Sequence, residues 1–370
     1  MQQNQEKRKM KVYDILNAGP NHRFMVNGKI VSNCSHTVQF QNLLRTHLDY
    51  LDFARDLVKQ GKSKPLRFCY GNVPDALGQL VRTALTASPG RFLTDCDFSA
   101  IEARVIAWLA GEEWALEEFR GDGKIYEATA SQMFNVPKDK IKKGNPEYEL
   151  RQRGKVATLA CGFGGGAAAM ERMDVGGKID KNEYPALVKQ WRSANPNIVK
   201  YWYAVEEAAV SALKTGFPAT VNPTGRAPVT FRHEASDLVH FLTAQLPSGR
   251  KLFYPFPGFT ENRFGNESIC YEGINQNNKS WGTVETYSGK LVENIVQATA
   301  RDLLAEALTR LENAGFEVIF SIHDEIVIDT PANVQNSLER VAEIMSTNPV
   351  WAEGLPLDAA GWTGKYFIKD

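Results

Sequence analysis

The stretch 317-EVIFSIHDEIVID-329 sets two apolar runs on either side of His323, Asp324 and Glu325. Short apolar runs around a few polar residues are typical of a β-hairpin, so the triplet is expected at the hairpin tip. A second stretch, 92-FLTDCDFSAIEARV-105, carries a strand-like run into Asp97. Strands far apart in sequence can pair in one sheet, and such pairing would bring Asp97 beside Asp324.

Two carboxylates that converge at strand ends offer oxygen ligands to a hard divalent cation such as Mg²⁺. Two such ions, about 4 Å apart, can hold the attacking and leaving oxygens of a phosphoryl transfer. Taken singly, each motif fits a cap or turn aspartate equally well, and the combination with other motifs decides between the two.

The surrounding pattern predicts an α+β fold, in which helices are inserted between distant strands. A strand is expected at 91–96, and hairpins and loops are expected over 245–289. The basic segment 138–155 is expected to lead into a further helix. Other helical segments are expected at 43–61, 79–86, 101–110, 184–215 and 291–314.

Composition restricts the class of protein. The 370 residues are 43% hydrophobic and 23% charged, and Lys+Arg equals Asp+Glu at 43 each. This is a globular profile without an apolar run of membrane-spanning length or a secretory signal, so no membrane partner is expected. Five scattered cysteines without CxxC spacing indicate a reducing compartment and argue against a zinc site. A cytoplasmic location is therefore expected, which the resemblance described below would place in a bacterium or a phage-infected host.

The segment 151-RQRGKVATLACGFGGG-166 places Arg151, Lys155 and Leu159 on one helical stripe. Two cations one turn apart suit phosphate groups, and the aromatic ring of Phe163 can stack on a base. The glycines lack the spacing of a P-loop. By itself the segment fits a solvated basic face followed by a glycine loop equally well.

These motifs together resemble family A DNA polymerases, especially replicative phage enzymes. The resemblance rests on segments 97–111, 151–166, ENIVQATARD at 293–302 and HDE at 323–325, with QFQNL at 39–43 and LPSGR at 246–250. It implies a right-hand polymerase fold. It divides the chain into palm at 34–114, fingers at 115–285 with the nucleotide-binding helix at 151–164, and palm again at 286–370.

The resemblance also implies roles for individual residues. Two Mg²⁺ ions would be bound by Asp97, Asp324 and the Phe98 carbonyl, with Glu325 beside them and Lys155 as proton donor to the pyrophosphate leaving group. The dNTP would be bound by Glu102, which would exclude a 2′-OH, and by Arg151, Lys155, Leu159 and Phe163. Primer or template DNA would be contacted by Gln41, Asn42, Arg104, Gly164, Gln297 and His323.

Three features depart from the family pattern. Phe163 stands where tyrosine is usual, which keeps stacking but removes a hydroxyl. Leu159 stands where many members have an aromatic residue, and QNLLR replaces QNLPR. The thumb helices that precede this region in the family are absent, so the chain is expected to begin too late to be a complete polymerase.

The stretch 22-HRFMVNGKIVSNCSH-36 carries Asn27-Gly28 between two apolar runs, a strong hairpin signal. Residues 11–33 with Cys34 resemble the C-terminal, HINT-type β-rich fragment of a naturally split intein, which gives a domain at 1–33. The resemblance implies that Asn33 cyclises and that Cys34 is the acceptor nucleophile. Asp14 and His22 would be the supporting acid/base pair, and Ser32 would stand where many inteins have histidine.

The sequence therefore predicts the C-terminal part of a DNA-directed DNA polymerase. A separate N-terminal polymerase and intein half would be joined to Cys34 by trans-splicing, and the product would act on primer-template DNA and dNTPs. Three alternatives stay open. They are a single-subunit RNA polymerase, which rNTP incorporation would reveal; a non-catalytic DNA-binding remnant; and an unspliced fragment that acts alone or by non-covalent assembly.

Overall fold

The computed structural model describes most of the chain after residue 42. The described residues are 23–26, 29–32, 43–236, 240–262, 264–275, 280–334 and 336–368. Asp14, His22, Asn33, Cys34, Gln41 and Asn42 lie outside them. Within the described part, none of the helices combines the length and the apolar character needed to cross a membrane.

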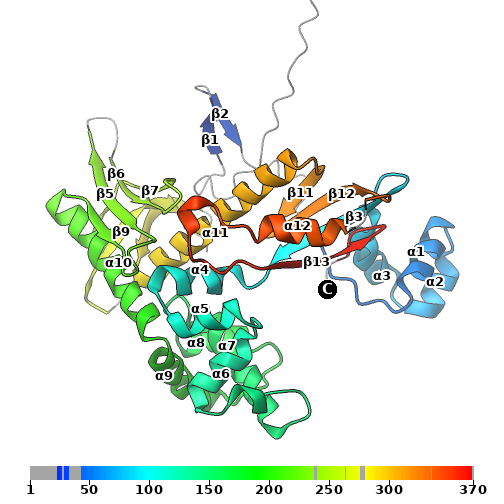
Figure 1. Cartoon of the computed structure of the whole chain (residues 1–370), viewed down its shortest axis with the longest axis horizontal. Coiled ribbons are helices and arrows are strands. Elements are labelled where there is room, and N and C mark those ends of the chain that lie inside the picture. Colours follow the sequence, from blue (N-terminus) through cyan, green and yellow to red (C-terminus); the bar gives the residue numbers. More distant parts are fainter. Residues whose placement is uncertain are drawn as a thin grey trace, which may run out of the picture.

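Helices and antiparallel sheets alternate along the chain (Figure 1), which agrees with the predicted α+β class. The helices are α1 Leu51–Lys59, α2 Ser63–Tyr70, α3 Val73–Leu80, α4 Ile101–Ala110, α5 Glu113–Arg120, α6 Ile125–Phe134, α7 Leu150–Cys161, α8 Ala167–Met173, α9 Tyr184–Ala194, α10 Pro196–Thr215, α11 Ser288–Asn313 and α12 Ser337–Met345. The strands are β1 Arg23–Val26, β2 Lys29–Ser32, β3 Arg91–Phe98, β4 Ala219–Val221, β5 Val229–Ala235, β6 His240–Gln245, β7 Lys251–Pro255, β8 Gly258–Glu261, β9 Glu267–Ile274, β10 Trp281–Thr286, β11 Val318–Ile322, β12 Glu325–Pro331 and β13 Ala359–Gly364.

The central sheet has the order β11-β12-β3-β13. β3 is the inner strand, and it pairs antiparallel with β12 on one side and with β13 on the other. Ile326 and Ile328 face the main core, where α12 packs, whereas Val327 faces a second cluster with Leu93 and Phe367. Burial on both faces explains why this part of the sequence is apolar at consecutive positions.

Two further sheets have the orders β4-β5-β6-β7 and β10-β9-β8. The strands β7 to β10 lie within the hairpin region predicted at 245–289, whereas β4, β5 and β6 begin before it and were not predicted. Between β3 and these sheets, helices α5 to α9 form a lobe on one side of the molecule (Figure 1). The long helices α10 and α11 pack against each other and against α4, so they connect the lobe to the central sheet.

The N-terminal hairpin is confirmed as a pair of strands. β1 and β2 are antiparallel, with Val26 opposite Lys29 and Arg23 opposite Ser32, so Asn27-Gly28 connects them. The residues to which splicing roles were assigned lie outside the described residues, apart from Ser32 at the end of β2.

Two predicted boundaries are wrong. The helix expected at 79–86 begins earlier, at Val73, because the Asn72 side chain accepts a hydrogen bond from the Asp75 amide and caps it; it passes into a 3₁₀ turn at Val81. The helix expected at 43–61 begins only at Leu51, because the residues before it are irregular.

Gly154 sets the distance between α6 and α7. A Cβ atom at this position would lie 2.3 Å from the Tyr126 carbonyl oxygen and 3.0 Å from the Ala130 Cβ. The two helices therefore approach closely because residue 154 has no side chain.

Gly154→Ala should consequently lower the free energy of unfolding by about 1–3 kcal/mol, the usual cost of overpacking. The sign is informative, because alanine in place of a helical glycine normally stabilises by about 1 kcal/mol. Urea unfolding measures the change. Gly282→Ala in β10 is the control, since its Cβ would meet nothing within 4 Å; equal effects for the two variants would contradict the close approach.

Candidate active site

The end of the central sheet brings together the acidic residues from the two distant stretches. Asp97 and Glu325 are directly opposite each other on β3 and β12. The Phe98 amide donates a hydrogen bond of 3.4 Å to the carbonyl oxygen of Asp324, which sits in the β11–β12 turn. The expected convergence of these stretches is confirmed.

The acidic residues at the sheet end differ in their surroundings. Asp97 and Asp324 are half-buried, whereas Glu325 is 2% exposed. The Arg82 guanidinium is nearby: burial lowers the pKa of Arg82, and the negative charge of Glu325 opposes that shift. Glu325 is therefore buried in the sheet, while the two aspartates are in more open surroundings.

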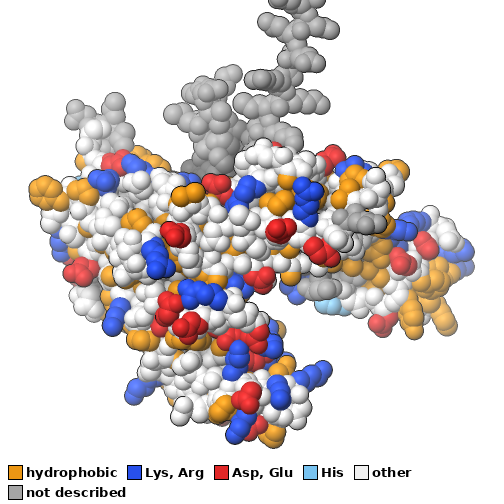
Figure 2. All heavy atoms as spheres, viewed as in Figure 1, with side chains coloured by type: hydrophobic (Ala, Val, Ile, Leu, Met, Phe, Trp, Pro, Cys, Tyr) orange, Lys and Arg blue, Asp and Glu red, His pale blue; other side chains and the backbone are white. Residues whose placement is uncertain are grey.

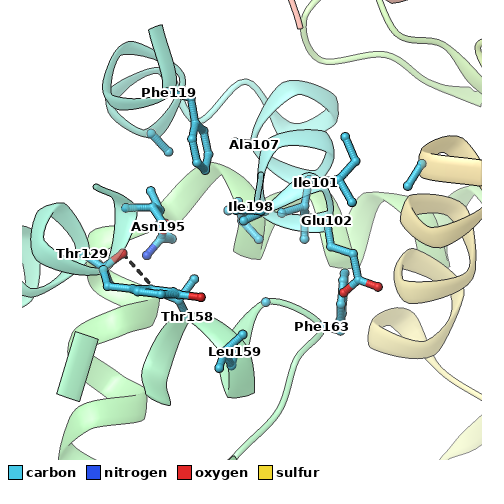
Figure 3. A pocket seen from close by; sticks show the side chains of 18 of the residues that line it. Ile101, Glu102, Ala107, Phe119, Thr129, Thr158, Leu159, Phe163, Asn195 and Ile198 are labelled. Atoms are coloured by element: carbon cyan, nitrogen blue, oxygen red, sulfur yellow. Dashed lines mark hydrogen bonds between the residues drawn. The ribbon is translucent and has the colours of Figure 1, made fainter. Parts of the chain in front are cut away.

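A cavity of about 670 Å³ opens beside the sheet end. Glu102 from α4, Leu159 and Phe163 from the α7 region, Gln297 from α11 and Asp324 all line it. Figure 3 shows Glu102 and Phe163 beside each other at one end, with Leu159 on the floor and the ring of Phe119 at the opposite, apolar end. The cavity therefore joins a polar mouth near the acidic residues to an apolar interior.

Glu102 and Gln297 form a hydrogen-bonded pair across the mouth. The Gln297 amide nitrogen donates to a Glu102 carboxylate oxygen at 3.2 Å. Removal of surrounding water raises the pKa of Glu102; the hydrogen bond from Gln297 opposes this rise, and the negative charges of Glu293 and Asp324 add to it. Gln297, expected to contact DNA, thus also positions the carboxylate of Glu102.

The α7 stripe has two parts. The Arg151 Nε donates a hydrogen bond of 2.8 Å to the Glu127 carboxylate. The Arg151 guanidinium lies 5.4 Å from the centre of the Tyr126 ring, and the Lys155 ammonium lies 5.9 Å from the same centre. Leu159 is 46% exposed and reaches the cavity. The cations at the start of the helix are therefore held by α6, and the cavity wall is formed by its second half.

The end of α7 is fixed to two other helices. Gly164 has a φ of +76°, and its carbonyl accepts a hydrogen bond of 3.3 Å from Arg192 in α9. Phe163 approaches the start of α11 so closely that a Cβ on Gly289 would lie 2.2 Å from its carbonyl oxygen. Between α7 and α6, the Thr158 hydroxyl donates a hydrogen bond of 3.1 Å to the Thr129 hydroxyl, the dashed line in Figure 3.

His323 and Arg104 occupy different environments. His323 is exposed at the hairpin tip, with a φ of +55°, and lines the cavity. Arg104 is 2% exposed. Its guanidinium donates to the carbonyls of Ser99 at 2.6 Å and Pro356 at 2.9 Å. The expectation that Arg104 contacts DNA is corrected, because these internal partners hold its side chain inside the protein.

Arg301 also lines the cavity and was not identified from the sequence. It follows Gln297 by four residues on α11, so both lie on one helical face. The i, i+4 spacing of Gln297 and Arg301 within 293-ENIVQATARD-302 is the sequence signal that could have identified it.

The comparisons with known proteins agree with this geometry. Residues 70–235 match the model of DNA polymerase family A. Residues 70–235 therefore correspond to a family A DNA polymerase domain. Over 335 residues the chain is 50% identical to the DNA polymerase of Bacillus phage SP02, a match that covers 90% of the chain and 50% of that protein.

One more distant sequence match and one structural match agree with this similarity. The polymerase domain is 24% identical to the thermostable DNA polymerase I of Thermus aquaticus over 80% of the chain and 30% of that protein. Its fold is similar to the POL domain of Pol1 from M. smegmatis, solved with primer-template DNA and dNTP, with a TM-score of 0.51 and 20% identity over 78% of the chain and 42% of that structure. The chain thus spans half or less of the length of these relatives.

Glu102→Gln should raise the stability of the polymerase domain at pH 7.5. Folding raises the pKa of Glu102, so the folded protein binds the Glu102 proton more tightly than the unfolded chain does. This contribution to the free energy of unfolding is complete below the pKa that Glu102 has in the unfolded chain. It is lost as pH rises through the pKa that Glu102 has in the folded protein. Glutamine keeps the uncharged form at every pH. The urea midpoint of the variant should therefore exceed that of the wild type at pH 7.5 and approach it near pH 4.

The matched control is Glu261→Gln, at an exposed position of β8. A Glu102→Gln effect that did not change with pH would show that desolvation of the carboxylate is not its cause.

Proposed function

We propose that this chain is the C-terminal part of a DNA-directed DNA polymerase that adds dNTPs to a primer. The observation that carries the proposal is that Asp97 and Asp324 come from adjoining segments at one sheet end. Asp324 there lines a cavity that Leu159 and Phe163 of the α7 region also line. The similarly folded M. smegmatis domain binds primer-template DNA and dNTP, which supports the same substrates here.

The donor set fits Mg²⁺. Asp97, Asp324 and the Phe98 carbonyl are all hard oxygen donors. Among the residues that the structure describes, no group of three or more His, Cys, Asp or Glu side chains is placed to hold a metal ion. Mg²⁺ is commonly bound by one or two carboxylates together with substrate phosphates, so two aspartates suffice. When bound, two Mg²⁺ ions would stabilise the negative charge on the phosphate oxygens in the transition state of the transfer.

The protein groups around the cavity would orient the reaction. Glu102, held by Gln297, lies where it would meet the sugar of the incoming nucleotide and disfavour a 2′-OH. Leu159 and Phe163 would pack on its sugar and base. Arg151 and Lys155, one turn apart at the start of α7, would contact the triphosphate, and Lys155 would protonate the leaving pyrophosphate.

The palm and fingers division follows the same logic. β3 from 34–114 shares one sheet with β12 and β13 from 286–370, which supports a palm made of two separated segments. Helices α5 to α10 lie in the intervening segment 115–285, proposed as fingers. Gly164, Gln297 and His323, with Gln41 and Asn42, would contact primer or template.

We also propose that residues 1–33 are a split-intein fragment that joins Cys34 to a separate N-terminal half. The β1–β2 hairpin and the Asn33-Cys34 junction after it support this. The Asn33 side-chain amide would attack its own carbonyl after Cys34 has accepted the upstream segment as a thioester, which breaks the Asn33–Cys34 bond and releases the intein with a terminal succinimide.

Primer extension tests the two aspartates in the product that contains residues 34–370 and the N-terminal half. Asp97→Ala and Asp324→Ala should each lower the extension rate more than about 100-fold, since groups that only orient metal ligands already give about 10- to 100-fold effects. Both variants should still bind primer-template DNA. Asp139→Ala, at an exposed position remote from the cavity, is the control. Unimpaired extension by either active-site variant would remove it from the proposed metal site.

Intact mass tests splicing. When the chain is mixed with its N-terminal partner under reducing conditions, a ligated species containing Cys34–Asp370 and a released fragment ending at Asn33 are expected. Asn33→Ala should stop release of that fragment, because alanine has no side-chain amide to cyclise. Two unchanged wild-type masses with a folded partner would favour non-covalent assembly.

A further inference from the structure

Helices α1, α2 and α3 form a small unit with a core of its own. Its buried residues are Ala54, Leu57, Leu66 and Leu80. The unit lies at the end of the molecule away from the α5–α9 lobe (Figure 1). The family A model begins at Tyr70, so α1 and most of α2 precede the matched region.

The unit is nevertheless firmly attached to the rest of the protein. The guanidinium of Arg82, which follows α3, lies 5.7 Å from the centre of the Phe367 ring. The Arg55 guanidinium lies 3.4 Å from the centre of the Tyr366 ring, and the Tyr366 hydroxyl donates to Asp52 at 2.8 Å. Its outer surface is therefore presented in a fixed orientation.

That outer surface is unusually apolar. Phe68 is 91% exposed, Tyr50 is 84% exposed and Phe53 is 51% exposed. Leu44, Val58, Leu77 and Val81 are further exposed apolar side chains of the same unit. Figure 2 shows hydrophobic side chains gathered at this end of the molecule. Concentrations of this kind mark protein–protein contacts.

We propose that this surface docks the part of the polymerase that the chain lacks, an inference that rests on the proposed function. The match covers 50% of the SP02 polymerase, so the other half of that protein has no counterpart in it. The proposed junction at Cys34 lies nine residues before Leu43. Nine extended residues span about 30 Å. The last residue of the N-terminal half, which would be joined to Cys34, must therefore lie within about that distance of Leu43.

The chemistry of the surface describes its partner. Lys62, Lys64 and Arg67 are exposed near Phe68, whereas Asp49, Asp52 and Asp56 are exposed near Tyr50 and Phe53. The docking face of the missing half should therefore be apolar, with carboxylates placed opposite these cations. Primer-template DNA and a second copy of this chain are the other possible occupants, and the experiment separates them.

Cys69 reports burial of this surface directly. It is exposed next to Phe68 in α2, whereas Cys96, Cys161 and Cys270 are buried. Burial keeps iodoacetamide away from these three thiols, so Cys69 is the exposed cysteine among those that the structure describes. Alkylation is read peptide by peptide, which separates Cys69 from Cys34, a residue outside the described part of the chain.

The full chain is mixed with the half of the SP02 polymerase that it does not match, produced as a separate polypeptide. Alkylation of Cys69 should become at least tenfold slower. The double variant Tyr50→Ser, Phe68→Ser should lose that protection and bind at least tenfold more weakly. Phe217→Ser, which removes a 74% exposed ring outside the unit, is the matched control and should change neither result.

Three results would overturn the proposal: no protection by the SP02 half, protection by DNA alone, or protection in the isolated chain that rises with its concentration. Primer extension by the assembly keeps the proposed function separate. Primer extension while Cys69 stays fully reactive would reject the docking surface and retain the proposed polymerase function. Protection of Cys69 without primer extension would retain the docking surface and count against the proposed polymerase function.

Discussion

The antiparallel pairing of β3 with β12 is the constraint on which the site depends. It sets Asp97 opposite Glu325 and brings the Phe98 amide to the Asp324 carbonyl, although more than 200 residues separate the strands. Because side chains alternate across a strand, a shift of one residue would turn Asp97 to the opposite face. Burial of Ile326 and Val327 in separate clusters on the two faces opposes such a shift.

The same sheet end explains the unequal environments of the acidic side chains. Glu325 enters the sheet and lies near buried Arg82, while Asp324 stays in the turn beside the cavity. Glu102 approaches from α4 and is held by Gln297 from α11. The cavity is thus assembled from elements that meet because the central sheet fixes where α4 begins, after β3, and where α11 ends, before β11.

Strong local signals in the sequence predicted much of this arrangement. The helix at 101–110 ends at Gly111, which has the positive φ that a glycine cap supplies, and the hairpin around 323–325 matched its apolar runs. The start of α3 was missed because it is defined by one hydrogen bond, from the Asp75 backbone amide to the Asn72 side-chain oxygen. The burial of Arg104 was missed because its partners are carbonyls, among them Pro356, which periodicity does not reveal. Splicing roles stay predictions.

The inner position of β3 also governs how the chain folds during synthesis. Its partner β13 is made about 260 residues later, which takes roughly 13–50 s at common translation rates. Until then one edge of an apolar strand has no neighbour, and long-range pairing of this kind is slow even in the complete chain. The nascent polypeptide therefore passes through a stage in which its central strand is open to aggregation, and a chaperone that shields 91–98 would raise the yield of folded protein.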